Sequence, residues 1–350
     1  IYNVETIKKK LDGKIDALIS SGTYADFFGS VLERDFAAVT PGAAAAATTV
    51  AAVSGFTYTI TRGAGSWITD GLKIGNVVRI TGAGIHANNI NKNLLIVALT
   101  ATVCTVLVLN STVMNAEGPI ATYDLTVVGT KTFTPLTGHT KDYYTIEEWY
   151  SDLSKSETFT DMRPANMAVS LPATGNATLS TDFIGLARTL GVAQVLTAPT
   201  LTSTPVMSAA NGAIYIGGNV QAFATAINFS ISNSAANSGA VIGSNSGQDD
   251  TTARIKDAGS LTAQFDSPTL QSLYAGESNT TIIVVLTGDE TATSEFISFT
   301  FGRVKITSDS PDDGEKVITR TYAFTAEYNS TGGAATAYEQ AILAINDSAA

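Results

Sequence analysis

Residues 143–190, with the sequence YYTIEEWYSDLSKSETFTDMRPANMAVSLPATGNATLSTDFIGLARTL, decide the fold of this chain. Two segments with the composition of strands, Asn166–Leu171 and Ala177–Leu186, are joined by a linker that holds one proline and one glycine. Proline fixes its own φ and glycine accepts a positive φ, and both properties favour turns. The linker therefore predicts a turn between two neighbouring strands.

The second of these segments alternates between two sets of side chains. The mainly apolar set occupies every second position, and the polar set lies between them: Ala177, Leu179, Thr181 and Phe183 against Thr178, Ser180 and Asp182. Successive residues of a strand point to opposite faces of a sheet. This segment is therefore predicted to have one buried face and one face in contact with water.

The composition favours extended β-structure and large assembly contacts over a solvated helical enzyme. Charged residues are only 15% of the 350 residues, and Thr, Ser, Ala, Gly and Asn take their place. A chain of this length can bury one large core or two ordinary ones. The net charge of −11 argues against gripping DNA, since phosphate binding needs clustered cations, but it does not argue against DNA passing by.

The first 55 residues predict strands, a helix and an arm. Tyr2–Lys10 and Lys14–Ser20 have the pattern of strands, and the dipeptide Asp12-Gly13 between them is typical of a hairpin turn. Thr23 is a candidate N-cap for a helix that continues to about Phe36. Residues 37–55 are low in complexity, and we expect them to form an extended arm or the edge of a hairpin.

Residues 56–128 predict a compact β-module of the size of a small barrel. Its expected strands are Phe56–Arg62, Val77–Thr81, Leu94–Thr100, Val103–Leu109 and Tyr123–Val128. Glycine and asparagine separate these segments, as turns require. The single cysteine, Cys104, lies within an apolar segment, so we expect it to be buried and no internal disulfide to form.

The rest of the chain predicts further strands and two helices. Ala213–Gly217 and Val220–Ser232 are expected to pair around a turn at residues 217–219, and Ser267–Tyr274 is expected to form a short helix. The other expected strands are Ala253–Asp266, Thr280–Leu286, Ile297–Thr307 and Lys316–Tyr328. Apolar residues at helical spacing in Ala334–Ile345 predict a helical tail that docks on a neighbouring subunit.

Four stretches together resemble the tail tube protein, or major tail protein, of long-tailed, non-contractile bacteriophages. They are SGTYADFFGSVLERDF at 21–36, GHTKDYYTIEEWYSD at 138–152, SLPATGNATLSTDFIGL at 170–186, and ISFTFGRVK with DDGEK at 297–316. The order and spacing of the motifs carry the resemblance, and it covers residues 12–36 and 66–328. The family usually has more sequence ahead of the position of Ile1, so we expect a segment upstream of it.

The resemblance implies a mainly β fold, a tail-tube β-barrel or sandwich of antiparallel sheets with one flanking helix and an inserted small β-module. We expect residues 1–49 to be the first part of the tube domain and 50–130 to be the inserted module. Residues 131–329 are then the main part of the tube domain, and 330–350 are the helical tail.

As function, the resemblance implies a structural virion protein that assembles in the host cytoplasm. Subunits would close into homohexameric rings, and stacked rings would form the tube through which phage DNA passes without specific binding. Further partners would be other tail proteins, such as the tape measure and the tail terminator. Membrane insertion, cofactors, metals and catalytic residues are not expected.

Catalytic chemistry has little support in the sequence. The two histidines, His86 and His139, belong to no zinc-binding pattern, and the chain has no G-x-S-x-G motif. Residues 82–87 superficially mimic a dinucleotide motif, but no helical pattern follows them, so we interpret them as a turn. The acidic pair Asp249-Asp250 is interpreted as solvated. Clustered carboxylates in Asp309–Glu315 leave a calcium site open as an alternative to a solvated turn.

Four acids lie singly on predicted strands. Asp16, Asp182, Asp266 and Glu327 each end or interrupt the polar face of a strand whose other face is apolar. Such a face is either wetted by bulk solvent or turned toward the lumen of a tube. The resemblance favours the lumen, because a tube needs a polar inner wall. We therefore expect these four acids to face the lumen and to give it a negative potential that repels phosphates.

Two other classes of protein remain as alternatives. One is a β-rich adhesin or glycan-binding virion protein, which should present surface aromatic residues on loops. Here the aromatic residues concentrate in residues 143–150, within the stretch that resembles tube proteins. The other is a secreted β-rich hydrolase, which should offer a base beside a nucleophile, and two loop histidines offer little.

Overall fold

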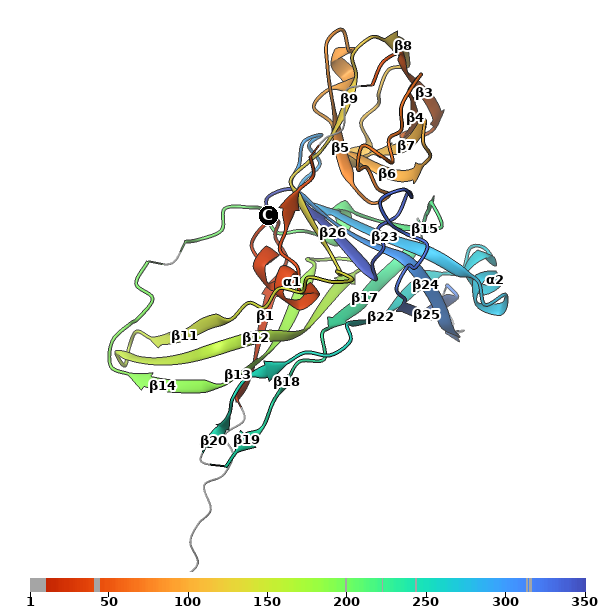
Figure 1. Ribbon diagram of the computed structural model, residues 1–350. Coiled ribbons are helices and arrows are strands. Elements are labelled where there is room, and N and C mark those ends of the chain that lie inside the picture. Colours follow the sequence, from red (N-terminus) through yellow and green to blue (C-terminus); the bar gives the residue numbers. More distant parts are fainter. Residues whose placement is uncertain are drawn as a thin grey trace, which may run out of the picture.

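The computed structural model describes residues 11–40, 45–198, 200–221, 223–242, 244–312, 314 and 317–350. Within these residues the protein is mainly β, and its strand ladders are antiparallel, as the sequence predicted. A large sheet of 15 strands forms the body, and a sheet of seven strands lies above it (Figure 1). The antiparallel arrangement allows one face of a sheet to pack on a core while the other stays in water.

The main sheet follows the order β1-β13-β12-β17-β22-β25-β24-β23-β15-β16, with shorter strands attached to it. The strand β12 is long enough to pair with β13 and β17 in one half, and with β11 and β14 in the other. The second half protrudes from the body as an arm (Figure 1). The strands of the main sheet are β1 (Leu11–Leu18), β2 (Ala37–Ala38), β10 (Thr130–Phe133), β11 (Tyr144–Tyr150), β12 (Lys155–Pro172), β13 (Thr178–Gly185), β14 (Ala187–Gly191), β15 (Gly212–Ile216), β16 (Asn219–Val220), β17 (Ala224–Ser232), β22 (Lys256–Gln264), β23 (Asn279–Thr287), β24 (Phe296–Asp312), β25 (Thr319–Ala326) and β26 (Leu343–Asp347).

The turn predicted between Asn166–Leu171 and Ala177–Leu186 is confirmed. β12 and β13 pair up to Ser170 and Thr178, so the chain reverses over the residues between them. Gly175 in this turn has φ of +98°, a value that residues with a Cβ rarely adopt. The predicted alternation is also confirmed, because Leu179, Thr181 and Phe183 are buried while the residues between them are more exposed.

The seven-stranded sheet has the order β8-β3-β4-β7-β6-β5-β9. Its two sides are linked by a bridge between Ala45 and Tyr123. Cys104 is fully buried here, and burial raises the pKa of its thiol. The strands are β3 (Thr48–Ser54), β4 (Thr57–Thr61), β5 (Val77–Thr81), β6 (Leu94–Leu99), β7 (Val103–Val108), β8 (Glu117–Ile120) and β9 (Asp124–Val127).

The core of this smaller sheet is continuous with the main sheet. Its hydrophobic cluster includes Tyr215 of β15, Ile283 and Val285 of β23, and Phe296 of β24. The ammonium group of Lys73 is also held by three backbone carbonyls, those of Gly333, Ala334 and Thr336. The smaller sheet therefore shares part of its packing energy with the body.

The remaining elements are short. Two short strand pairs lie below the body: β18 (Ala236–Asn237) with β21 (Asp250–Thr251), and β19 (Ala240–Val241) with β20 (Ser244–Gly247) (Figure 1). Three 3-10 turns occur, at Ala87–Asn89, Leu109–Ser111 and Ala209–Asn211. The helix α1 (Ala25–Leu32) packs on the main sheet, and α2 (Thr269–Ala275) lies near β24.

Aromatic rings fill the core beneath α1. The ring of Phe299 lies 5.6 Å from that of Phe28 and 5.1 Å from that of Phe229, measured between centroids. Phe301 continues this cluster toward Phe324, at 6.0 Å. All these pairs are edge-to-face, an arrangement that stabilises beyond the area that the rings bury. The cluster ties α1, β17, β24 and β25 together.

The hairpin predicted at Asp12-Gly13 is wrong. The strand β1 runs straight through this dipeptide, with Asp12 paired to Ile184 and Gly13 to Phe183. The dipeptide favours a turn by itself. It lies in a strand here because β13 supplies backbone partners along the whole length of β1. The strand predicted at Tyr2–Lys10 lies outside the described residues.

The first helix is present but shorter than predicted. It ends at Leu32, because Glu33 takes a left-handed conformation with φ of 58°. Thr23 is not its N-cap. That position belongs to Tyr24, and the hydroxyl of Thr23 instead bonds to the hydroxyls of Ser20 and Thr202. Phe28, Val31 and Leu32 are buried and form the side of the helix that faces the core.

The helical tail predicted for the last residues is wrong. Residues 334–342 contain no helix, and Leu343–Asp347 is the strand β26, paired with both β10 and β24. Leu343 and Ile345 are buried in the core of their own chain, which removes the basis for docking on a neighbour. The apolar residues of this segment fit the strand period of two as well as a helical period. The segment forms a strand because its backbone pairs with β10 on one side and with β24 on the other.

Two other predictions need correction. Val220–Ser232 is not one strand paired with β15. Asn219–Val220 pairs with β15, and the chain then crosses to become β17 between β12 and β22. The low-complexity segment is not a free arm, since Thr48–Ser54 is strand β3 between β4 and β8, which agrees with the hairpin alternative. Residues 41–44 of that segment lie outside the described part.

The carboxyl group of Asp257 is buried inside the main sheet. Asp257 of β22 lies on the core side of the main sheet at 1% exposure, and neither of its carboxyl oxygens has a hydrogen-bond partner in the described part of the chain. Burial raises the pKa of Asp257 well above its ordinary value of 3.8. The native state therefore binds this proton more tightly than the unfolded chain does.

This pKa gives a stability prediction. The free energy of unfolding should fall as the pH rises from 3.8 toward the native pKa of Asp257, and should stay lowered above it. In the Asp257→Asn variant that loss is absent, so the variant should gain stability relative to the wild type as the pH rises. Urea unfolding at several pH values measures this difference. Asp152→Asn, at an exposed acid, is the control, and parallel profiles for Asp257→Asn and the wild type would show that Asp257 is not the group responsible.

Candidate functional site: the polar face of the main sheet

Half of the main sheet has two chemically distinct faces. Across β13, β12, β17, β22 and β25, residues in register on one face are small and polar or are alanines. One such row consists of Thr178, Ser170, Asn228, Ser260 and Ala323, and the next consists of Ser180, Ala168, Ser230, Ala258 and Thr325. The residues of these rows are half-buried or exposed, and most of the residues between them are buried.

The opposite face forms the main core. It carries apolar side chains at the alternate positions of the same strands: Leu179, Phe183, Met167, Val169, Ile227, Phe229, Ile231, Leu261, Tyr322 and Phe324. A one-residue shift in the register of any strand would exchange the two faces. The burial of the apolar face therefore fixes which side chains the polar face presents.

Side chains on the polar face bond to one another across the strands. The hydroxyl of Ser170 donates to the amide oxygen of Asn228 at 2.5 Å, and the hydroxyls of Thr262 and Thr321 lie 3.0 Å apart. The amide of Asn166 donates to the carboxylate of Asp182 at 3.0 Å. Cross-strand pairs of this kind hold short side chains close to the sheet. The polar face is consequently low in relief and rich in hydroxyl groups.

Three of the four expected acids lie on or directly beside this face, and the fourth does not. Asp16 is in register with Ser180, and Asp182 with Asn166. Glu327 follows Ala326, the last paired residue of β25. Asp266 lies between β22 and α2, beyond the last paired residue Gln264. The structure thus groups three acids and separates one.

Basic residues that were not predicted as part of the site lie among these acids. The ammonium group of Lys14 lies 3.0 Å from the carboxylate of Asp16, and the guanidinium of Arg303 lies 3.1 Å from that of Glu327. The hydrogen bond from Lys14, with a second from Ser180, lowers the pKa of Asp16. The same period of two that selected Asp16 also places Lys14 on its face, so the alternation could have found it.

The strand β1 is one edge of the main sheet, and within the described residues its only ladder is with β13. The amide of Ile19 donates to the carbonyl of Ala177. In an antiparallel pair, residues whose backbone groups point to the partner strand alternate with residues whose groups point away, so the backbone groups of Lys14, Asp16 and Leu18 point away from β13.

A second open edge lies across the sheet. The last part of β24, residues 306–312, pairs with β25 on one side, and the described residues supply no ladder on its other side. The polar face therefore extends between two edges that form no further ladder in the described part of the chain.

The other candidates from the sequence do not form a catalytic centre. The imidazole of His139 lies 2.7 Å from the carboxylate of Glu33, which also contacts the buried guanidinium of Arg163 at 3.2 Å. His86 accepts a hydrogen bond from the amide of Asn88 and so caps a 3-10 turn. The prediction that both Asp249 and Asp250 are solvated is wrong for Asp250, which is fully buried.

No group of three or more His, Cys, Asp or Glu side chains in the described chain could hold a metal ion. The calcium alternative at Asp309–Glu315 includes residues outside the described part. The carboxylate of Asp309 accepts from the guanidinium of Arg320 at 2.6 and 2.8 Å. Of the described helices, none has the length and apolar character needed to cross a membrane.

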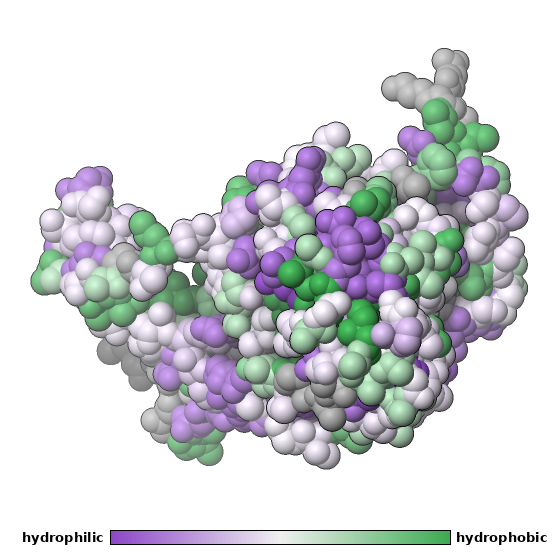
Figure 2. Space-filling view, turned by 90° about the horizontal axis from the view of Figure 1, so that it is seen from above, coloured by the Kyte–Doolittle hydropathy of each residue, from purple (hydrophilic) through white to green (hydrophobic). Residues whose placement is uncertain are grey.

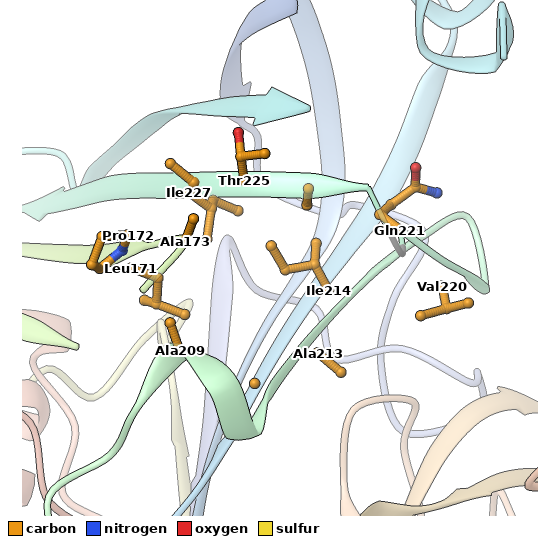
Figure 3. Close-up of a pocket in the computed structure, with 13 residues that line it drawn as sticks. Leu171, Pro172, Ala173, Ala209, Ala213, Ile214, Val220, Gln221, Thr225 and Ile227 are labelled. Carbon is orange, nitrogen blue, oxygen red and sulfur yellow. The ribbon is translucent and has the colours of Figure 1, made fainter. Parts of the chain in front are cut away.

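A groove between β12, β15 and β17 is lined by apolar and small residues. Figure 3 shows Leu171, Ile214 and Ile227 around it, with Gln221 and Thr225 as polar side chains. The cavity has a volume of about 270 Å³, and its lining contains no acidic, basic, histidine or cysteine residue. The described lining therefore offers no titratable side chain that could act as a general acid or base.

Seen from above the smaller sheet, hydrophilic and hydrophobic residues are interspersed over the surface, and the arm protrudes to one side (Figure 2). The most regular arrangement of side chains on the molecule is the polar face of the main sheet, where small polar residues and alanines lie in register across the strands. These features define a class: a β-structural protein whose main sheet presents a broad polar face.

The comparisons agree with this class. The family model described as phage tail tube protein matches residues 11–326. This match covers nearly the whole chain, so the chain belongs to the phage tail tube protein family and is a structural component of the bacteriophage tail. None of the curated proteins matches the chain.

Proposed function

We propose that this protein assembles into homohexameric rings that stack into the tail tube of a non-contractile phage, and that the tube conducts DNA into the host bacterium. The observation that carries the proposal is the polar face of the main sheet. This face crosses several strands, has short side chains, and lies between two edges without a further ladder in the described chain. The proposed lumen wall is this face, with Asp16, Asp182 and Glu327 on it.

The two edges supply a mechanism for ring closure. An exposed strand edge is a template for pairing with another chain, and natural proteins cover such edges or use them. β1 of one subunit and residues 306–312 of β24 in the next would pair and continue the sheet around the ring. Both edges belong to one subunit but lie on different strands, so the contact is heterologous. Heterologous contacts close into a ring where the rotation between neighbours is a whole fraction of a full turn.

The proposal also assigns the other parts of the chain. The seven-stranded sheet is an insertion of about residues 50–130 in the tube domain, carried beside the wall. Partners are other copies of this chain, the tape measure and tail terminator proteins, and DNA that passes without specific binding. The assembly takes place in the host cytoplasm. No reaction is assigned to any residue.

Negative-stain microscopy of the purified protein tests the proposal. We expect rings or hollow tubes whose walls are one subunit thick. Discrete monomers at all protein concentrations, together with binding to host glycans, would support the adhesin alternative instead. Monomers without glycan binding would contradict both.

A further inference from the structure

The charged residues of the polar face are concentrated at one end of the strands. One row crosses seven strands in register and alternates in sign at both ends: Lys14, Asp182, Asn166, Ser232, Lys256, Glu327 and Arg303. Glu327 joins this row because it follows Ala326, the partner of Asp257, and because its amide donates to the carbonyl of Arg303 at 2.8 Å.

The next row begins with Asp16, which pairs with Lys14, and reaches Lys305 beyond Thr325. Lys305 has its own partner, the carboxylate of Glu277 at 3.1 Å. The two rows after these, from Thr178 to Ser308 and from Pro172 to Ser310, contain no charged residue.

The charge of this face is therefore close to balanced, although the whole chain carries −11. In the described strands, the alternation places acids and bases on the face in nearly equal numbers: Asp12, Asp16, Asp182, Asp312 and Glu327 against Lys14, Lys256, Arg303 and Lys305. The large excess of acid lies elsewhere on the molecule.

Alternating charges cancel over a short distance. Neighbouring strands are about 4.8 Å apart, which is less than the Debye length of about 8 Å at physiological ionic strength. A phosphate that stays several ångströms above the row meets bases and acids together, and the resulting field is small. The expected repulsion by four acids alone would need those acids to lack such counterions.

We propose that Asp16, Asp182 and Glu327 act as counterions for Lys14, Lys256 and Arg303, so that the wall is non-adhesive to duplex DNA by charge balance and not by repulsion. This inference rests on the proposed function, because it takes the polar face to be the wall that DNA passes. It identifies the three acids as the groups that prevent the bases from holding phosphates.

The test compares the binding of a labelled duplex of about 20 base pairs by fluorescence anisotropy, at subunit concentrations below the onset of assembly. The wild-type chain should show no salt-dependent binding. The triple variant Asp16→Asn/Asp182→Asn/Glu327→Gln leaves the bases uncovered, and it should bind at least about tenfold more tightly than the wild type at about 50 mM salt. With three phosphate contacts, from Lys14, Lys256 and Arg303, its affinity should fall about 40-fold between about 50 and 200 mM salt.

A matched control has the same change in net charge outside this face. Asp152, Asp161 and Glu290 are exposed acids on other parts of the molecule, and Asp152→Asn/Asp161→Asn/Glu290→Gln should bind no better than the wild type. Circular dichroism establishes that all three proteins have the same fold. Three results would overturn the inference: binding by the wild type with the salt dependence of the face variant, no binding by the face variant, or equal binding by the control.

The appearance of rings or tubes in microscopy is a separate readout. If the wild type forms tubes but its face binds DNA, the proposed function survives and charge balance is wrong. If the wild type forms neither rings nor tubes, the proposed function fails whatever the DNA measurement shows.

Discussion

We expect the Asp16→Pro variant to fold normally and to form no rings. The backbone amide of Asp16 points away from β13, so proline at this position leaves the ladder between β1 and β13 intact. It removes a donor from the open edge and places its ring where a neighbouring strand would approach. A loss of about 1.4 kcal/mol of binding free energy weakens each contact between subunits tenfold. In a closed ring this loss occurs at every interface.

The Asp16→Ala variant is the matched control, because it removes the same carboxylate but keeps the amide. Sedimentation and negative-stain microscopy over a range of concentrations measure the effect. We expect the onset of assembly to rise at least about tenfold for proline and to change little for alanine. Rings formed equally well by the proline variant would show that β1 is not an assembly edge.

The second large effect concerns the aromatic core. Phe299 is fully buried, and its ring contacts the rings of Phe28 and Phe229. Phe299→Ala removes both contacts and leaves a cavity where α1, β17 and β24 meet. The free energy of unfolding should fall by about 3–5 kcal/mol, which is the usual cost of such a substitution in a core.

Phe223→Ala is the control for this substitution, since Phe223 is 48% exposed and precedes β17. We expect it to cost about 1 kcal/mol or less, because about half of its surface is already in water. Urea unfolding followed by circular dichroism compares the two variants. Equal losses of stability would mean that the aromatic cluster is not the centre of the core.

The sequence was most informative where the burial pattern is unambiguous. The turn between β12 and β13, the alternation in Thr178–Gly185, and most strands of both sheets follow from periodicity and turn residues. It was misleading where local and tertiary preferences compete. Asp12-Gly13 favours a turn by itself, but a continuous ladder with β13 satisfies more backbone groups. Leu343 and Ile345 fit two periods, and only the open ladder beside β10 and β24 makes them a strand.

For the candidate site, the sequence located individual acids but not their surroundings. Alternation places Asp16 and Asp182 on polar faces, whatever the rest of the fold. It does not reveal that Asp182 lies beside Lys14, which is 168 positions earlier, because this neighbourhood depends on the register between β1 and β13. In the sequence, Asp266 continues the polar alternation of its strand in the same way as the other acids. In the structure, β22 ends at Gln264, before Asp266 is reached.

By itself, the amino-acid sequence determined that this protein is an antiparallel β-protein of the phage tail tube family. The period of two and the order of the motifs are both visible along the chain, without knowledge of which strands are neighbours. Only the tertiary structure decided that the polar faces of separate strands join into one surface, that its acids have basic neighbours, and that β1 and β24 are left at its edges. The physical reason is that register and strand order are set by burying all the apolar faces together, and a single strand carries no information on its neighbours.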